Sequence, residues 1–305
     1  MMRLGMYGLG RMGANMVRRL ARGGIEVVAH NRSRAPIDEL VASEPGVQPA
    51  YSLDALIAGL PSPRIVWLML PAGEITEQAI TEILPRLAEG DLLIDGGNSF
   101  YQDTIRRAAR VQAAGVQYMD VGTSGGVWGL KNGYSLMFGG SAAAAEMIRP
   151  AIEVLAPAAD KGWGHVGPVG SGHFTKMIHN GIEYGMMQAL AEGLAVLRAK
   201  KEFDLDLAQI TELWRDGSVV QSWLLDLTAE ALAAQGQALS HIAPVVADSG
   251  EGRWTATEAI NLGVPAPVMT LALQMRFASQ DAEGYPNRLL SLMRNAFGGH
   301  AITPQ

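Results

Sequence analysis

The chain of 305 residues contains no cysteine, and this absence removes three kinds of chemistry at once. Disulfide bridges, thiolate metal sites and cysteine nucleophiles all need that residue. Aromatic residues make up only 6% of the chain, whereas apolar residues make up 48% and include 15 methionines. This composition is typical of a folded protein whose helices pack through aliphatic and flexible side chains.

Positive charge and long hydrophobic runs are also scarce. The net charge is −6 and no cluster of lysine and arginine occurs, so we expect neither nucleic acid nor a membrane surface as a partner. The longest apolar stretch, residues 185–197, is interrupted by Gln188 and Glu192 and is too short to span a bilayer, so we expect a buried helix there. A strand-like run begins at Arg3, which leaves no room for a signal peptide and favours a cytoplasmic enzyme.

Short apolar runs alternate with helical patterns through the first half of the chain. The predicted strands are residues 3–7, 26–30, 64–70, 91–95, 116–121 and 134–138. The predicted helices are residues 14–22, 75–87, 101–114 and 142–155. Such a series indicates an α/β domain of the Rossmann type, with a doubly wound, mostly parallel sheet that binds ligands at the carboxyl ends of its strands.

Glycine and proline become dense between residues 162 and 172, and we place a domain boundary there, between a dinucleotide-binding domain at 1–166 and a second domain at 167–305. Helices are predicted at residues 171–200, 207–216, 222–234, 255–261, 265–279 and 287–297, without a good strand signal. Their apolar residues lie on more than one side. We therefore expect an all-α domain that binds substrate and packs against further copies of the chain, in a homodimer or homotetramer.

A glycine-rich turn directly follows the first predicted strand and opens the first helix. Its residues are Gly8, Leu9, Gly10, Arg11, Met12 and Gly13. Gly8 allows a tight turn, Gly10 lets the backbone approach a pyrophosphate, and Gly13 permits close contact between helix and strand. The context predicts a dinucleotide site made by all six residues. Further candidates for this site, at the end of the third predicted strand, are Leu70, Pro71 and Ala72.

The second predicted strand ends at Asn31, Arg32 and Ser33, where an NAD-binding protein would place an acidic residue on the ribose diol. No acidic residue stands there. Asn31 and Ser33 can donate hydrogen bonds and Arg32 can pair with a 2′-phosphate, so we favour NADP as cofactor and keep NAD as possible. The alternative is a surface arginine that stacks on the adenine and permits either cofactor.

A polar stripe interrupts an otherwise apolar helical segment. Lys176, His179, Asn180, Glu183 and Tyr184 recur at steps of three and four residues, so one face of a helix carries them. Ionisable groups in apolar surroundings are costly unless they are paired or used, which indicates a site. The alternatives are an internal ion pair between the lysine and the glutamate, a packing histidine and a half-buried tyrosine.

Two further glycine-rich turns, at residues 95–99 and 120–126, also end predicted strands. Asn98 and Ser124 stand there, where the sheet's ligands bind, and their short polar side chains suit a nicotinamide amide or a substrate hydroxyl or carboxylate. A third glycine-rich turn joins the stripe through Gly167, Gly170 and Gly172.

Because this third glycine-rich turn leads to Lys176 and Asn180, the sequence resembles the β-hydroxyacid dehydrogenase superfamily. His179, Glu183 and Tyr184, with the turns at 95–99 and 124–126, resemble more narrowly the 6-phosphogluconate dehydrogenase family. Residues 252–255 and the tail at 294–300 agree, and the resemblance covers nearly the whole chain in a short form. The sequence departs from the long enzymes at one position, where a phosphate-binding lysine is replaced by Ser249.

The resemblance implies oxidative decarboxylation of 6-phosphogluconate to ribulose 5-phosphate, without a metal, in the pentose phosphate pathway. It implies that Lys176 takes the hydroxyl proton, that Glu183 protonates the enediol, and that His179 and Asn180 orient hydroxyl groups. The residues implied for the substrate carboxylate are Ser124, Gly125 and Gly126. Those implied for the phosphate are Tyr184, Arg276 and, from the tail of a neighbouring subunit, Arg294. His300 of the same tail is implied for binding of the substrate.

Two other functions stay open at this point. One is a 3-hydroxyisobutyrate-like dehydrogenase that does not decarboxylate its product, and Glu183 and the arginines speak against it because a short unphosphorylated substrate needs neither. The other is a non-catalytic NADP-binding sensor, against which the presence of Lys176 and Asn98 speaks.

Overall fold

The computed structural model describes residues 2–304 of the chain. It consists of two compact units, the first ending at His179 and the second beginning at Asn180. The domain boundary that we predict lies earlier, at residues 166 and 167. The division falls later because the first turns of helix α8 (Ser171–Ala199) pack against the sheet of the first unit.

Eight strands form one sheet in the first unit, in the order β3-β2-β1-β4-β5-β6-β7-β8. Strands β1 to β6 pair in parallel, β7 is antiparallel to β6, and β8 is parallel to β7. The strands are β1 (Arg3–Tyr7), β2 (Glu26–His30), β3 (Val47–Ala50), β4 (Ile65–Leu68), β5 (Leu92–Asp95), β6 (Gln117–Ser124), β7 (Ser135–Gly139) and β8 (Trp163–Gly167). The chain order reverses between β1 and β4, and in sheets of this class the crevice at such a point binds ligands. The predicted Rossmann-type fold is confirmed.

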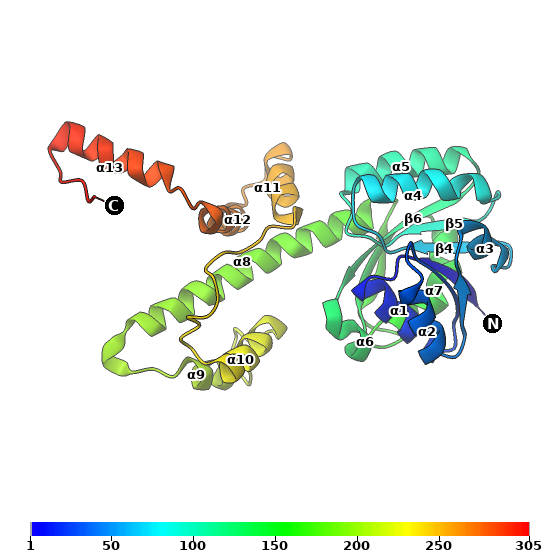
Figure 1. Cartoon of the computed structure of the whole chain (residues 1–305), viewed down its shortest axis with the longest axis horizontal. Coiled ribbons are helices and arrows are strands. Elements are labelled where there is room, and N and C mark those ends of the chain that lie inside the picture. Colours follow the sequence, from blue (N-terminus) through cyan, green and yellow to red (C-terminus); the bar gives the residue numbers. More distant parts are fainter. Residues whose placement is uncertain (1, 305) are drawn as a thin grey trace. The chain divides into compact units, whose positions relative to one another are not determined.

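Helices cover both faces of this sheet (Figure 1). The helices on one face are α1 (Arg11–Arg22), α2 (Ala35–Ser43), α6 (Gly129–Asn132) and α7 (Ala142–Leu155), and those on the other are α3 (Leu53–Ala58), α4 (Glu74–Ile83) and α5 (Tyr101–Ala113). Short 3-10 helices follow α4 at Leu84–Arg86 and β6 at Gly126–Trp128.

Each face of the sheet has its own hydrophobic core. Leu20 of α1 and Ile37 of α2 are fully buried on one face, and Ile80 of α4 and Val111 of α5 are fully buried on the other. Strand β4, Ile65–Leu68, is buried along its whole length, as expected for a central parallel strand covered by helices on both sides. Burial of each large aliphatic side chain stabilises the fold by about 1.5–3 kcal/mol.

The second unit contains only helices within its described residues, which confirms the all-α prediction there. After α8 come α9 (Leu207–Trp214), α10 (Trp223–Gln235), α11 (Glu251–Asn261), α12 (Pro267–Gln280) and α13 (Tyr285–Gly298), with a 3-10 turn at Lys201–Phe203. Helix α9 packs on α10, and α11 packs on α12. Large apolar side chains of α12 and α13 face solvent, among them Leu271, which is 59% exposed, and Leu290, which is 56% exposed.

Several sequence-based expectations need correction. Strands β3 and β8 and helices α2 and α3 were not predicted, because β3 is a short edge strand containing Pro49 and β8 lies in the glycine-rich segment where we placed the boundary. The segment 185–197 is helical, but the expectation that it is buried is wrong for the single chain, since Met186 is 42% and Val196 is 70% exposed.

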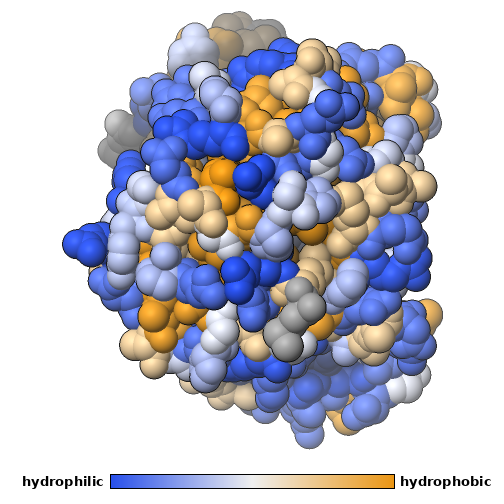
Figure 2. Space-filling model, turned by 90° about the vertical axis from the view of Figure 1, so that its right-hand side faces the viewer, coloured by the Kyte–Doolittle hydropathy of each residue, from blue (hydrophilic) through white to orange (hydrophobic). Residues whose placement is uncertain are grey.

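The surface of the chain mixes residue types. Figure 2 shows hydrophilic and hydrophobic residues interspersed across the viewed face. Between residues 2 and 304, none of the helices has the length and apolar character that crossing a membrane requires.

Candidate active site

The turn from Gly8 to Gly13 joins β1 to α1 at the point where the strand order reverses. Gly8 has a φ of +109°, and a Cβ there would lie 2.3 Å from the carbonyl oxygen of Met69. A Cβ at Gly13 would lie 2.1 Å from the carbonyl oxygen of Gly8. Side chains are excluded from both positions, so helix α1 begins directly against the ends of β1 and β4.

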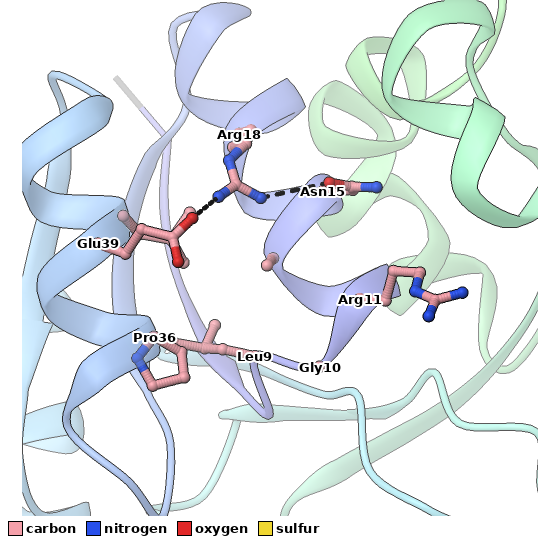
Figure 3. A pocket seen from close by; sticks show the side chains of 9 residues that line it. Leu9, Gly10, Arg11, Asn15, Arg18, Pro36 and Glu39 are labelled. Atoms are coloured by element: carbon pink, nitrogen blue, oxygen red, sulfur yellow. Dashed lines mark hydrogen bonds and ion pairs between the residues drawn. The ribbon is translucent and has the colours of Figure 1, made fainter.

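Gly10 is the N-cap of α1, and nothing lies within 4 Å of the place where its Cβ would be. A pocket of about 210 Å³ opens there between α1 and α2 (Figure 3). On its far side Arg18 contacts Glu39 at 2.5 Å, whereas Arg11 points away from that pair. The open backbone beside Gly10 and the N–H groups of the helix N-terminus fit a pyrophosphate.

Asn31 holds this turn from the end of β2. Its Oδ1 accepts a hydrogen bond from the backbone N–H of Leu9 at 3.1 Å, and its Nδ2 donates to the hydroxyl of Ser33 at 3.0 Å. Arg32 is exposed between them. Burial raises the pKa of Tyr7 at the end of β1, Glu82 adds to this, and the charge of Arg32 opposes it. Arg32 therefore places positive charge close to the end of β1, where the dinucleotide would bind.

The loops after β4 and β5 carry the next predicted residues. Leu70 is half-buried, and the residues that follow it in an exposed turn are Pro71 and Ala72. Asn98 is exposed in the loop after β5. A Cβ at Gly97 would lie 2.6 Å from the carbonyl oxygen of Leu70, so the two loops are in direct contact.

Asp120 of β6 is fully buried and anchors the first turn of α8. Its two carboxylate oxygens accept the backbone N–H groups of Gly170 and His173, each at 2.7 Å. Burial raises the pKa of Asp120, although the charge of His173 and these two N–H groups act to lower it. Because the first N–H groups of a helix lack partners within it, the carboxylate fixes where α8 begins. We did not predict this role, and its one signal in the sequence is an aspartate inside a predicted buried strand.

Lys176 is half-buried where α8 crosses β6. A Cβ at Gly122 would lie 2.5 Å from the Cβ of Lys176 and 2.9 Å from the carbonyl oxygen of Gly172. Nearer the end of β6, the hydroxyl of Ser124 lies 3.4 Å from Nε2 of His179. The structure thus brings the lysine, the histidine and the serine to the carboxyl end of one strand. The chain then turns through two glycines with positive φ, Gly125 and Gly126.

Asn180 and Glu183 follow on α8 at the start of the second unit, and both are half-buried. Since α8 is one continuous helix, their spacing from Lys176 and His179 places all four on one face of it. The predicted stripe is therefore a single helical face.

Tyr184, 6% exposed, lies in a polar cluster of the second unit. Its hydroxyl lies 3.3 Å from that of Ser249, and the guanidinium carbon of Arg276 lies 3.4 Å from its ring centroid. The hydroxyl of Ser249 donates to the buried carboxylate of Glu251 at 2.6 Å. Gly252 lies against the tyrosine ring, because a Cβ there would be 2.6 Å from it. The position that departs from the long enzymes thus holds a serine paired with a carboxylate.

The tail residues of the prediction lie at the end of the second unit. Arg294 is exposed on α13, and His300 is exposed beyond it, where Asn295 donates to its carbonyl oxygen at 2.8 Å. A contribution of this tail to a neighbouring site therefore stays a prediction. Across residues 2–304, no group of three or more histidine, aspartate and glutamate side chains is placed to hold a metal ion.

Two family models match the chain. The model of the NAD binding domain of 6-phosphogluconate dehydrogenase matches residues 3–166, and that of the C-terminal domain of 6-phosphogluconate dehydrogenase matches residues 172–285. A decarboxylating, NAD(+)-dependent 6-phosphogluconate dehydrogenase of Haloferax volcanii is 40% identical over 99% of this chain and 98% of its own length. A decarboxylating 6-phosphogluconate dehydrogenase of Bacillus licheniformis is 37% identical over 90% of this chain, which spans only 61% of that longer protein.

Solved structures agree with these matches. The 6-phosphogluconate dehydrogenase of Plasmodium falciparum, solved in its apo form, with NADP+ and with 6-phosphogluconate, has a TM-score of 0.85 at 29% identity and covers 99% of this chain, which spans 66% of that one. A 3-hydroxyisobutyrate dehydrogenase of Mycobacterium tuberculosis has a TM-score of 0.73 over 93% of this chain and 95% of its own, but at 22% identity it shows the fold alone. With two family models that together span most of its length, the chain belongs to the 6-phosphogluconate dehydrogenase family.

Proposed function

We propose that this chain oxidises 6-phosphogluconate at C3 and releases C1 as carbon dioxide, which gives ribulose 5-phosphate and a reduced nicotinamide. The observation that carries the proposal is the placement of Lys176 and His179 at the carboxyl end of β6, on a helix whose next turn carries Glu183. The Haloferax volcanii relative, named as a decarboxylating enzyme of this kind, supports the same reaction.

The stripe on α8 supplies the acid and base groups that the reaction needs. Lys176 takes the proton of the C3 hydroxyl as C3 is oxidised. A bound nicotinamide supplies the acceptor for the hydride. When the C1–C2 bond breaks, its electron pair passes towards the C3 oxygen, and Lys176 stabilises that oxygen by donating a hydrogen bond or proton. Glu183 then gives a proton to C2, the carbon that carbon dioxide has left.

Binding of the substrate uses groups from both ends of the stripe. We assign the carboxylate to Ser124, Gly125 and Gly126, and the hydroxyls to His179, Asn180 and Asn98. We assign the phosphate to Tyr184 and Arg276 together with Arg294 from the tail of a second copy, whose His300 also contacts the substrate. An arginine suits this role because a guanidinium can pair with a phosphate through two parallel N–H groups. The exposed apolar side chains of α12 and α13 support packing against that second copy.

For the cofactor we favour NADP, with NAD as the alternative, and one substitution tests the preference. If Arg32 pairs with the 2′-phosphate, Arg32→Ala should weaken NADP binding by about tenfold, the lower range for a charge-assisted hydrogen bond, and leave NAD unchanged. Equal losses for the two cofactors would reject this role. We also propose a cytoplasmic location, because the phosphorylated sugar acid and the dinucleotide are multiply charged and cannot cross a membrane unaided.

One assay tests the proposed reaction against its two rivals. The purified chain is given 6-phosphogluconate, gluconate or 3-hydroxyisobutyrate, with NADP and NAD in parallel, and the absorbance of the reduced nicotinamide and the released carbon dioxide are both followed. We expect both signals with 6-phosphogluconate only. Reduction without carbon dioxide would indicate a 3-hydroxy acid dehydrogenase, and cofactor binding without any turnover would indicate a sensor.

A further inference from the structure

Two neighbouring arginines of α5 have opposite environments. The side chain of Arg106 is 60% exposed, whereas that of Arg107 is 1% exposed. An arginine is almost never fully buried unless its charge and donors are engaged. All three guanidinium nitrogens of Arg107 donate hydrogen bonds, and their acceptors lie in two segments at the carboxyl end of the sheet, one that follows β4 and one at the end of β5.

The first pair of acceptors stands at the end of β5 and in the loop that follows it. One terminal nitrogen of Arg107 donates to the carboxylate of Asp95 and to the hydroxyl of Ser99, both at 3.3 Å. Ser99 in turn donates to Asp95 at 2.9 Å, and the backbone N–H of Gly97 donates to the same carboxylate at 3.1 Å. This network is buried, and it holds the backbone on both sides of the exposed Asn98.

The second pair of acceptors belongs to the turn and helix after β4. The other terminal nitrogen of Arg107 donates to the carbonyl oxygen of Gly73, the N-cap of α4, at 3.0 Å. Its Nε donates to Glu77 of the same helix, also at 3.0 Å. Burial acts to raise the pKa of Glu77, but the hydrogen bond from Arg107 and the charges of Arg110 and Arg106 outweigh it and lower the pKa. The carboxylate therefore stays ionised opposite Arg107.

We propose that Arg107 is a positioning residue that locks the β4–α4 turn and the β5–α5 loop together and thereby places the nicotinamide half of the cofactor. In a sheet of this order, one nucleoside lies over β1 to β3 and the other over β4 to β6. Gly10 and Arg32 serve the first half, whereas the two loops that Arg107 joins border the second. The inference rests on the proposed function only in requiring that a nicotinamide dinucleotide binds.

The chemistry of the guanidinium group explains why an arginine, and not a lysine, stands at position 107. A guanidinium is planar and always charged, and its rigid fork can reach acceptors on two loops at once. A lysine would keep the positive charge next to Asp95 but has a single ammonium group, which cannot reach Gly73 and Ser99 together. Arg107→Lys should therefore fold and yet lose the connection between the loops.

The test compares binding of the whole dinucleotide with binding of its adenosine half. The variants are Arg107→Met and Arg107→Lys, and Arg106→Met is the matched control because it removes the same charge from the neighbouring, exposed position. The ligands are NADPH with 2′,5′-ADP, or NADH with ADP if the wild type prefers it. Fluorescence of the reduced nicotinamide reports its binding, and displacement calorimetry reports binding of the half-molecule.

We expect both Arg107 variants to lose roughly tenfold in affinity for the dinucleotide and about 100-fold in kcat, as misplaced reacting groups do, with an unchanged affinity for the half-molecule. Arg106→Met should change neither affinity. Equal weakening of both ligands, or no weakening of the dinucleotide, would overturn the proposal. So would failure of both Arg107 variants to fold, because the arginine would then serve stability alone. Since the two binding measurements need no sugar acid, they decide the role of Arg107 even if the wild type is inactive, a result that would refute only the proposed reaction.

Discussion

Arg107 of the first unit and Arg276 of the second differ in how deeply their guanidinium groups are buried and in how many of their donors are used within the chain. Arg107, in the first unit, is buried and its donors are taken by side chains and backbone of two loops. Arg276, in the second unit, is half-buried, donates to the carbonyl oxygen of Ala247 at 2.9 Å and covers the ring of Tyr184. A guanidinium has five N–H donors, so Arg276 can still offer donors to a ligand. The arginine of the first unit is therefore fully engaged within the chain, whereas Arg276 of the second unit keeps donors that a ligand can use.

The largest effect should come from removing Lys176, the proposed base. We expect Lys176→Ala to lower kcat between about 10²- and 10⁴-fold, the usual contribution of a positioned acid or base. Cofactor affinity should be unchanged, because the glycine turn at Gly8 to Gly13 does not involve the lysine. Stopped-flow turnover and nicotinamide fluorescence measure the two quantities. Near-normal turnover would remove Lys176 from the mechanism.

The next largest effect concerns Glu183, near the start of the second unit. Glu183→Gln should slow turnover by about 10²-fold, because an amide cannot deliver the proton that replaces carbon dioxide. The loss should lie after oxidation, so hydride transfer in a single turnover stays fast while release of product slows. The solvent isotope effect on kcat measures this step, and an unchanged rate with an unchanged isotope effect would reject the role.

The tight contact between β6 and α8 predicts a smaller effect. In Gly122→Ala the new methyl group would meet the Cβ of Lys176 at 2.5 Å, so the helix must shift. We expect a loss of about 1–3 kcal/mol in the free energy of unfolding, as for other overpacked cores. Gly164→Ala in β8 is the control, because nothing lies within 4 Å of its Cβ position. Denaturant unfolding compares the two, and equal losses would show that the contact does not matter.

The smallest predicted effect is a pH dependence at Asp120. Because burial raises its pKa in the folded chain, the folded carboxyl binds a proton more readily than the unfolded one. The contribution of this carboxyl to the free energy of unfolding is therefore greatest below the ordinary aspartate pKa of about 3.9. It falls as the pH rises through the raised pKa of the folded chain. Asp120→Asn cannot ionise, so the stability of the wild type relative to this variant should fall across that window. A difference that grows with pH would contradict this.

Much of the first unit could be predicted because its signals are local. The strands Arg3–Tyr7 and Glu26–His30 were predicted with their observed bounds, since each is a short apolar run followed by a turn. The glycine turn and the stripe on α8 could likewise be recognised, because the residues of each lie close together in the sequence. Strand β8 was missed because two of its five residues are glycine, which weakens the strand pattern.

The hydrogen bonds that hold the loops and the helix around the site could not be predicted, because the two partners of each bond lie far apart in the sequence. Asp120 binds the N–H of Gly170, fifty residues later, and Arg107 binds the carbonyl oxygen of Gly73, thirty-four residues earlier. The predicted strand that contains Asp120 indicates its burial, but only the fold shows its partners and shows that Arg107 is buried. The pairing of Ser249 with Glu251 is local, but its place beside Tyr184 depends on the packing of α11 and α12.

One face of α8 carries the groups that we propose for both the oxidation and the decarboxylation. The most direct test uses 6-phosphogluconate labelled with ¹³C at C1 and follows labelled carbon dioxide and reduced nicotinamide in the same reaction. We predict that the wild type forms them in equal amounts and that Lys176→Ala forms both at least about 100-fold more slowly. Reduced nicotinamide without labelled carbon dioxide would contradict the account.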